Sequence, residues 1–169
     1  MRTVVADSGP LRYLVLIGEI DILPKLMGHV LIPPEVSAEL DRPQTPASVR
    51  AWIAAPPSWL AVRPGLDVTD LALAELDPGE RAAIALALAI GADAVLMDDR
   101  AGGTAALANG LAVLGTIGVL DRAARRGLVD LEAAFTRLRA TNFRYPAALL
   151  DTLLEEHRRT ADGEPSDGA

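Results

Sequence analysis

Two adjacent carboxylates, Asp98 and Asp99, follow the apolar stretch AVLM at residues 94–97. A strand-like run that stops on two like charges is either entering a solvated turn or delivering acid to a site. Asp is common in turns because its side chain bonds nearby backbone N–H groups. Turn chemistry therefore explains either residue when it is taken alone.

A third carboxylate, Asp7, ends the first predicted strand at residues 2–6. In an open parallel sheet, ligands bind beyond the carboxyl ends of the strands, near the point where the strand order reverses. Asp7 and the pair Asp98–Asp99 follow two different predicted strands and are expected at the same edge of the sheet. Their coincidence favours a site over two unrelated turns.

Two glutamates are candidates to join them. Glu39 falls in the last turn of a predicted helix at 34–40, where the helix dipole disfavours a carboxylate. A solvated surface glutamate explains it equally well. Glu80 is the third residue after Asp77 in DPGE, and this spacing is typical of a capping box at a helix start. A carboxylate in the first turn also projects beyond the sheet edge, so capping and chemistry are compatible.

Acids from four segments indicate an all-oxygen cluster. The chain has no Cys, and its only histidines, His29 and His157, are interpreted as structural or exposed. Concentrated carboxylates need compensating charge, which a hard divalent cation such as Mg²⁺ or Mn²⁺ supplies. Such an ion orients a water and stabilises charge on a phosphodiester.

The elements that must position these acids alternate along the chain. Strands are predicted at 2–6, 29–33, 59–63, 92–97 and 111–115, and helices after Ser8, at 34–40, near 49–55, at 76–91, up to 109–110, and near 117–126, 130–139 and 146–158. Ser8 is expected to cap the first helix. This alternation predicts an α/β fold with a mostly parallel sheet of about five strands, covered by helices on both faces.

Length and composition narrow the class of protein. The 169 residues predict one domain over 1–158 and a disordered acidic tail over 159–169. No apolar run reaches the ~20 residues that cross a bilayer. With no signal-peptide pattern and no Cys, we expect a cytoplasmic protein without membrane contact.

Charge and motifs exclude several functions. The net charge of −7 argues against a protein that coats nucleic acid nonspecifically. Fifteen of the sixteen basic residues are Arg, and eight of them, including Arg144, lie between 122 and 159, which reflects either composition bias or a phosphate-facing surface. No dinucleotide or P-loop motif, nucleophile elbow or HExxH motif is present.

The order of motifs VVADSGPL, PPEVSAEL, LDPGERAAIALALAIGADAVLMDDR and LGTIGVLDRAARRGLVD resembles the PIN-domain family, in particular a VapC-like branch long labelled a domain of unknown function. The resemblance covers roughly residues 2–157. It implies a three-layer α/β/α sandwich, often dimeric, and Mg²⁺- or Mn²⁺-dependent cleavage of single-stranded RNA, frequently as the toxin of a toxin–antitoxin pair.

Matching the family motifs places the metal ligands on Asp7, Glu39, Glu80 and Asp99. Counting from Glu80 puts the usual strand-end acid on Asp99, which leaves Asp98 as the second choice, as a supporting group or as a cap for the following helix. Supporting roles fall on Ser8, beside the first acid, and on the segment after the acidic pair. Relatives often carry a basic residue there, whereas this chain has Gly102-Gly103-Thr104, so Arg100 is the expected substitute.

The leading hypothesis is therefore a metal-dependent endoribonuclease, with RNA as substrate, a small antitoxin protein as partner and a homodimer as the assembly. The alternative is a weakly active or inactive PIN-like module that binds RNA or protein. A small metal-dependent phosphatase is a third possibility, which turnover of phosphomonoesters would reveal.

Overall fold

The structure, a computed structural model, describes residues 2–66 and 73–163. Its strands are β1 (Arg2–Ala6), β2 (Gly28–Ile32), β3 (Leu60–Val62), β4 (Ala94–Leu96) and β5 (Val113–Leu114). Its helices are α1 (Ser8–Leu16), α2 (Ile22–Met27), α3 (Pro34–Leu40), α4 (Ala47–Ala54), α5 (Pro78–Ile90), α6 (Arg100–Ala108), α7 (Thr116–Arg125), α8 (Leu131–Arg139) and α9 (Ala147–Ala161). Every helix in these two ranges is too short or too polar to cross a membrane.

The five strands form one parallel sheet in the order β3-β2-β1-β4-β5. The chain winds outward from β1 to β3 and then crosses to the other side of β1 for β4 and β5. The strand order therefore reverses between β1 and β4, and the carboxyl ends of these two strands are the place where an open α/β sheet binds ligands. The expected five-stranded parallel sheet is confirmed.

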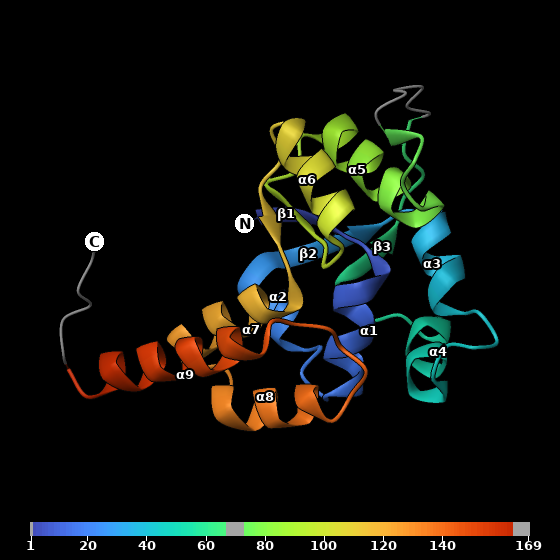
Figure 1. Cartoon of the computed structure of the whole chain (residues 1–169). Helices are drawn as coiled ribbons and strands as arrows, with labels where there is room; N and C mark the ends of the chain where they lie inside the picture. Colours follow the sequence, from blue (N-terminus) through green and yellow to red (C-terminus); the bar gives the residue numbers. More distant parts are fainter. Residues whose placement is uncertain (1, 67–72, 164–169) are drawn as a thin grey trace.

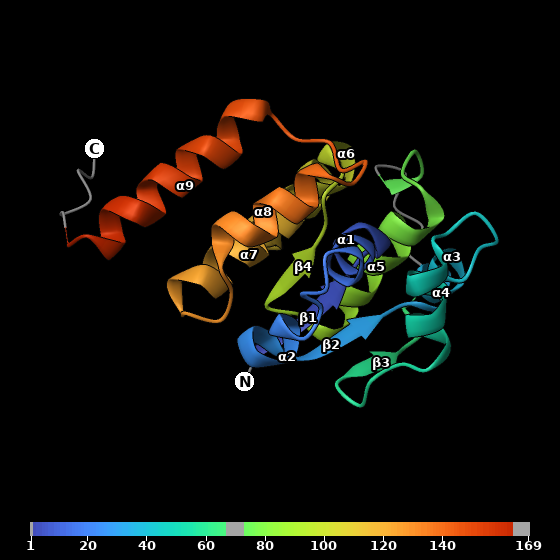
Figure 2. The same ribbon diagram turned by 90° about the horizontal axis from the view of Figure 1, so that it is seen from below.

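Helices cover both faces of the sheet, which makes three layers (Figure 1). Val4 and Ala6 of β1 pack in one core with α1, α2, α7, α8 and α9, whereas Val5 packs in a second core with α5 and α6. Successive side chains of a strand point to opposite faces, so a strand buried on both sides is apolar at every position. Figure 2 shows α8 and α9 as an outer pair beside α7. The predicted α/β/α sandwich is confirmed.

The sequence missed some local features. It predicts no helix between Gly18 and His29, yet α2 forms there because its Leu23 and Met27 are buried in the core and its Pro24 lies in the first turn. The cap position of α1 belongs to Asp7, and Ser8 is the first helical residue, so the predicted Ser8 cap is wrong. Helix α9 continues to Ala161, past the expected domain end at 158, while residues 164–169 of the expected tail lie outside the described ranges.

Candidate active site

The predicted acids meet in a pocket of about 360 Å³ at the carboxyl ends of β1 and β4. We call it the acidic pocket. It is lined by Asp7, Ser8, Gly9, Tyr13, Glu39, Asp77, Glu80, Asp98, Asp99, Asn142, Phe143 and Arg144. All four predicted metal ligands and Asp98 are therefore brought together by segments far apart in the sequence.

Asp7 is the most buried carboxylate of the pocket. Its backbone N–H donates to Leu96 O at 2.9 Å, which fixes the end of β1 against the end of β4. The side chain is only 6% exposed, and its Oδ1 has no hydrogen-bond partner. Burial, followed by the charges of Glu39, Asp98 and Asp77, raises the pKa of Asp7 to about 7, although the backbone N–H of Ser8 opposes the rise. Asp7 thus lies in the site as an acid without local compensation.

Glu80 occupies the first turn of α5 and is 9% exposed. Burial and then the charges of Asp99, Asp7 and Asp77 raise its pKa to about 7, while a hydrogen bond from the backbone N–H of Asp77 acts in the other direction. The side chain of Asp77 makes no capping bond to the helix, so the Asp77 half of the predicted capping box is missing. The negative charges of Asp7 and Asp99 are therefore both close enough to Glu80 to disfavour its ionised form.

Glu39 enters from the last turn of α3, as its odd position on that helix suggested. It is half-buried and lies 3.9 Å from Arg42 in a loose ion pair. Glycine at position 79 makes its approach to Asp7 possible. A Cβ on Gly79 would lie 2.7 Å from Glu39 Oε2 and 3.5 Å from Asp7 Oδ1, so the glycine of DPGE leaves the space that the two acids share.

Asp98 and Asp99 have different partners. Asp99 is the cap of α6, and its Oδ2 accepts from the backbone N–H groups of Ala101 at 2.9 Å and Gly102 at 3.0 Å. Asp98 instead accepts from Thr116, at 2.7 Å from the backbone N–H and 2.6 Å from the hydroxyl. Burial raises the pKa of Asp98, and the Thr116 bonds oppose the rise. The interpretation of Asp98 as a helix cap is wrong: Asp99 caps α6, and Asp98 fastens β4 to the start of α7.

Of the residues predicted to support the metal ligands, only Ser8 lies at the acidic pocket. Ser8 lines the acidic pocket, but Arg100 and Thr104 are exposed and are not among its lining residues. The Thr104 hydroxyl donates to Arg100 O at 2.9 Å, within the helix itself. The basic residue at the pocket is Arg144, which comes from the segment between α8 and α9 together with Asn142 and Phe143. Sequence reasoning placed Arg144 only in the late Arg cluster, because nothing local indicates that this segment returns to the sheet edge.

The donor set of the acidic pocket suits a hard cation. Carboxylate oxygens are the ligands that Mg²⁺ and Mn²⁺ prefer. Asp7 Oδ1 has no hydrogen-bond partner, and burial together with neighbouring carboxylates raises the pKa of Asp7 and of Glu80. A bound cation would compensate this buried negative charge. Across residues 2–66 and 73–163, no three Asp, Glu, His or Cys side chains form a ready metal-binding cluster. The acids therefore fit a divalent ion by chemistry and by their charge imbalance, without forming a ready set of ligands.

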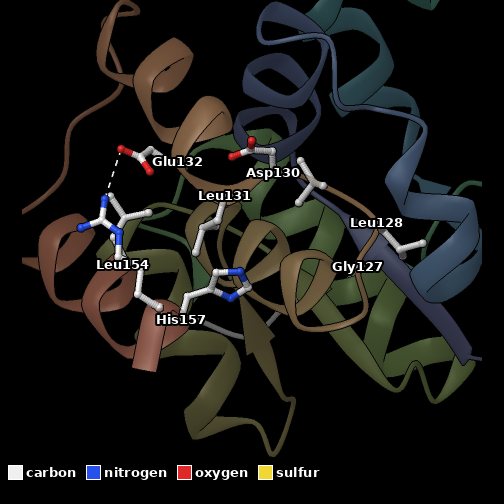
Figure 3. A pocket seen from close by; sticks show the side chains of 9 residues that line it. Gly127, Leu128, Asp130, Leu131, Glu132, Leu154 and His157 are labelled. Atoms are coloured by element: carbon white, nitrogen blue, oxygen red, sulfur yellow. Dashed lines mark ion pairs between the residues drawn. The ribbon is translucent and has the colours of Figure 1, made fainter. Parts of the chain in front are cut away.

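A larger cavity, of about 530 Å³, lies between α9 and the loop that leads into α8 (Figure 3). We call it the α9 pocket. Its charged side chains already have partners: Glu132 pairs with Arg158 at 3.1 Å, and Asp130 caps α8 by accepting from Ala133 N at 3.0 Å. His157 lies there beside Leu131 and Leu154, away from the acidic pocket.

Comparison with known proteins supports the resemblance seen in the motifs. The model of the family DUF3368, described as a PIN domain, matches residues 3–159. No curated protein and no solved structure matches the chain. The match covers the whole sheet except Arg2, the first residue of β1, and it includes every acid of the acidic pocket. The chain belongs to the PIN-domain family.

Proposed function

We propose that this protein is a metal-dependent endoribonuclease that cleaves single-stranded RNA at the acidic pocket. PIN domains are generally nucleases, and the fold is nuclease-like. The observation that carries the proposal is the pair Asp7 and Glu80, two buried acids at the point where the strand order reverses. Burial first and neighbouring carboxylates second raise the pKa of each to about 7. A structural core has no use for such a pair, whereas a cation site does.

In this proposal Asp7, Glu39, Glu80 and Asp99 hold one or two Mg²⁺ or Mn²⁺ ions. When bound, the ion lowers the pKa of a water and stabilises the negative charge that builds up on the phosphodiester. Asp99 keeps α6 capped through Oδ2, and both cap bonds go to that one oxygen, which leaves Oδ1 for the ion. Asp98 acts through Thr116 by fixing the end of β4. Cleavage leaves a 3′-hydroxyl and a 5′-phosphate.

A second candidate is a PIN-like module that binds RNA or protein without cleaving it. The observation in its favour is that the described acids form no ready three-ligand cluster. It predicts a well-folded protein that binds RNA but leaves it intact in Mn²⁺.

The toxin role is the finer part of the proposal. A small antitoxin would cover the acidic pocket with a basic side chain, and the protein would act as a homodimer. A small gene next to this one, encoding a DNA-binding amino terminus, supports that role if its product co-purifies with this chain and blocks cleavage. Sedimentation at micromolar concentration tests the dimer.

The decisive test is cleavage of generic single-stranded RNA in Mg²⁺ and Mn²⁺, with mapping of the new ends. We expect Asp7→Asn to reduce cleavage by more than about 100-fold, because even residues that only support metal ligands cost about 10–100-fold when lost. Glu132→Gln, in the α9 pocket, is the matched control and keeps wild-type cleavage. Intact RNA after incubation with folded wild-type protein in Mn²⁺ would favour the binding module, and turnover of phosphomonoesters alone would favour a phosphatase.

A further inference from the structure

One basic residue, Arg144, lines the acidic pocket. Among the described residues that line it, six are carboxylates and Arg144 alone is basic. The Arg144 side chain is exposed, and it forms no ion pair with a carboxylate of residues 2–66 or 73–163. Arg144 therefore lines the pocket with a side chain that none of the described carboxylates pairs with.

The backbone around Arg144 is held in place. Phe143 N donates to Thr141 Oγ1 at 3.2 Å, and that hydroxyl donates to Leu138 O at 2.6 Å at the end of α8. The phenol of Tyr13 in α1 donates to Asn142 Oδ1 at 2.9 Å. These bonds fix the segment 141–143 between α8 and α1.

Aromatic contacts secure the same segment on both sides of Arg144. The rings of Tyr13 and Phe143 meet edge to face with centroids 4.8 Å apart, and Phe143 stacks near Tyr145 at 6.1 Å. The segment runs beside α1 in Figure 1. An arginine whose backbone is already held needs no ordering of the main chain on binding, so only its side chain has to be ordered against a ligand.

The chemistry of that ligand follows from its neighbours. Six carboxylates repel a polyanion, so RNA needs local positive charge to approach the pocket. A guanidinium binds two phosphate oxygens through parallel N–H donors, which a single ammonium cannot do. We propose that Arg144 is a phosphate-positioning residue, which binds the RNA backbone at the mouth of the acidic pocket. This inference rests on the proposed function.

The competing explanation is that Arg144 only offsets the charge of the carboxylates. Removal of Arg144 would then alter thermal stability and Mn²⁺ affinity but leave RNA binding unchanged. A phosphate contact has a separate signature, because each one lost from a single-stranded complex lowers the slope of log affinity against log salt by about 0.7.

The test measures binding of a single-stranded RNA oligonucleotide to the full chain in Ca²⁺ across a salt series, with cleavage followed in Mn²⁺. We expect Arg144→Ala to weaken binding about tenfold and to lower the salt slope by about 0.7. Arg144→Lys should keep the slope but recover only part of the affinity, because it loses the bidentate contact. Tyr13→Phe, which removes only the bond to Asn142, should raise KM more than it lowers kcat.

Arg159→Ala is the matched control, since Arg159 is an exposed arginine of α9 that lies outside the acidic pocket. It should bind and cleave as the wild type does. Wild-type affinity and slope in Arg144→Ala would overturn the positioning role and leave the nuclease intact. A wild-type protein that neither binds nor cleaves RNA would overturn the proposed function together with the role of Arg144.

Discussion

The acidic pocket and the α9 pocket both contain carboxylates, but only those of the α9 pocket all have partners. The α9 pocket is the larger, at about 530 Å³ against 360 Å³, but its Glu132 and Asp130 are satisfied by Arg158 and by the start of α8. In the acidic pocket Asp7 is buried with an unpartnered oxygen, and Glu80 is buried among other carboxylates.

The two pockets differ in how the loss of water around their carboxylates is compensated. The exposed acids of the α9 pocket replace water with a nearby cation or a helix N-terminus, and this exchange changes the free energy of unfolding little. Buried acids cannot do so without a partner, and their pKa values rise instead. Buried carboxylates without partners at the ends of two central strands, rather than cavity volume, are therefore the basis on which we propose the acidic pocket as the functional site.

The largest expected effect separates the two adjacent acids of the acidic pocket. Asp99→Asn should reduce cleavage by more than about 100-fold, whereas Asp98→Asn, which acts through Thr116, should cost about 10-fold. Asparagine still caps a helix, so the loss in Asp99→Asn comes without unfolding. Cleavage rates, measured together with melting temperatures, show which of the two acids matters more. A larger loss of cleavage in Asp98→Asn than in Asp99→Asn would assign the metal ligand to Asp98.

Glycine at 79 gives a steric test of the same pocket. A Cβ at this position would lie 2.7 Å from Glu39 Oε2, so Gly79→Ala should push the carboxylate of Glu39 away from that of Asp7. A displacement of about 1 Å can cost about 100-fold in rate, which sets the upper limit of the expected loss. The control is Gly103→Ala in α6, where a Cβ has room at 3.7 Å from Val113. It should keep full cleavage and gain about 0.5–1 kcal/mol of stability.

The raised pKa values of Asp7 and Glu80 predict a pH dependence of stability that arises in the acidic pocket. Between about pH 4 and pH 7 the unfolded chain loses the protons of Asp7 and Glu80 while the folded chain keeps them, so these groups lower the free energy of unfolding as the pH rises. The loss is complete above pH 7 and is on the order of 4 kcal/mol for Asp7 alone.

Chemical denaturation in EDTA at pH 5 and pH 8 measures this loss. The double variant Asp7→Asn/Glu80→Gln is the reference. All other titrating groups contribute equally to the pH dependence of both proteins, so the difference between them reports Asp7 and Glu80 alone. Mn²⁺ at pH 8 should restore the stability of the wild type only. An equal pH dependence in both proteins would contradict the assigned pKa values.

The smallest effect belongs to the α9 pocket. The Glu132–Arg158 pair is exposed on both sides, and exposed pairs contribute about 0–1 kcal/mol. Glu132→Gln should thus change the free energy of unfolding by no more than that, with cleavage unaltered. Loss of RNA cleavage in this variant would show that the comparison between the two pockets is mistaken.

Local signals made much of this architecture predictable. Apolar runs that end on Asp7 and on Asp98–Asp99 identified β1, β4 and the shared edge, and DPGE located the start of α5 with Glu80. Side-chain contacts between segments that are distant in sequence could not be predicted from the sequence. Asp98 and Asp99 are neighbours in sequence, yet only their contacts with Thr116 and Gly102 separate their roles. Arg144 reaches the acidic pocket because Tyr13 holds the segment before it.

Titration calorimetry of Mn²⁺ at pH 7, repeated in buffers of different ionisation enthalpy, tests whether the acidic pocket binds a divalent cation. An ion that displaces the protons held by Asp7 and Glu80 must release them to the buffer. We expect Mn²⁺ binding with proton release in the wild type and in Glu132→Gln, and loss of this binding in Asp7→Asn. Binding that persists unchanged in Asp7→Asn, or no binding to the wild type, would contradict the acidic pocket as a cation site.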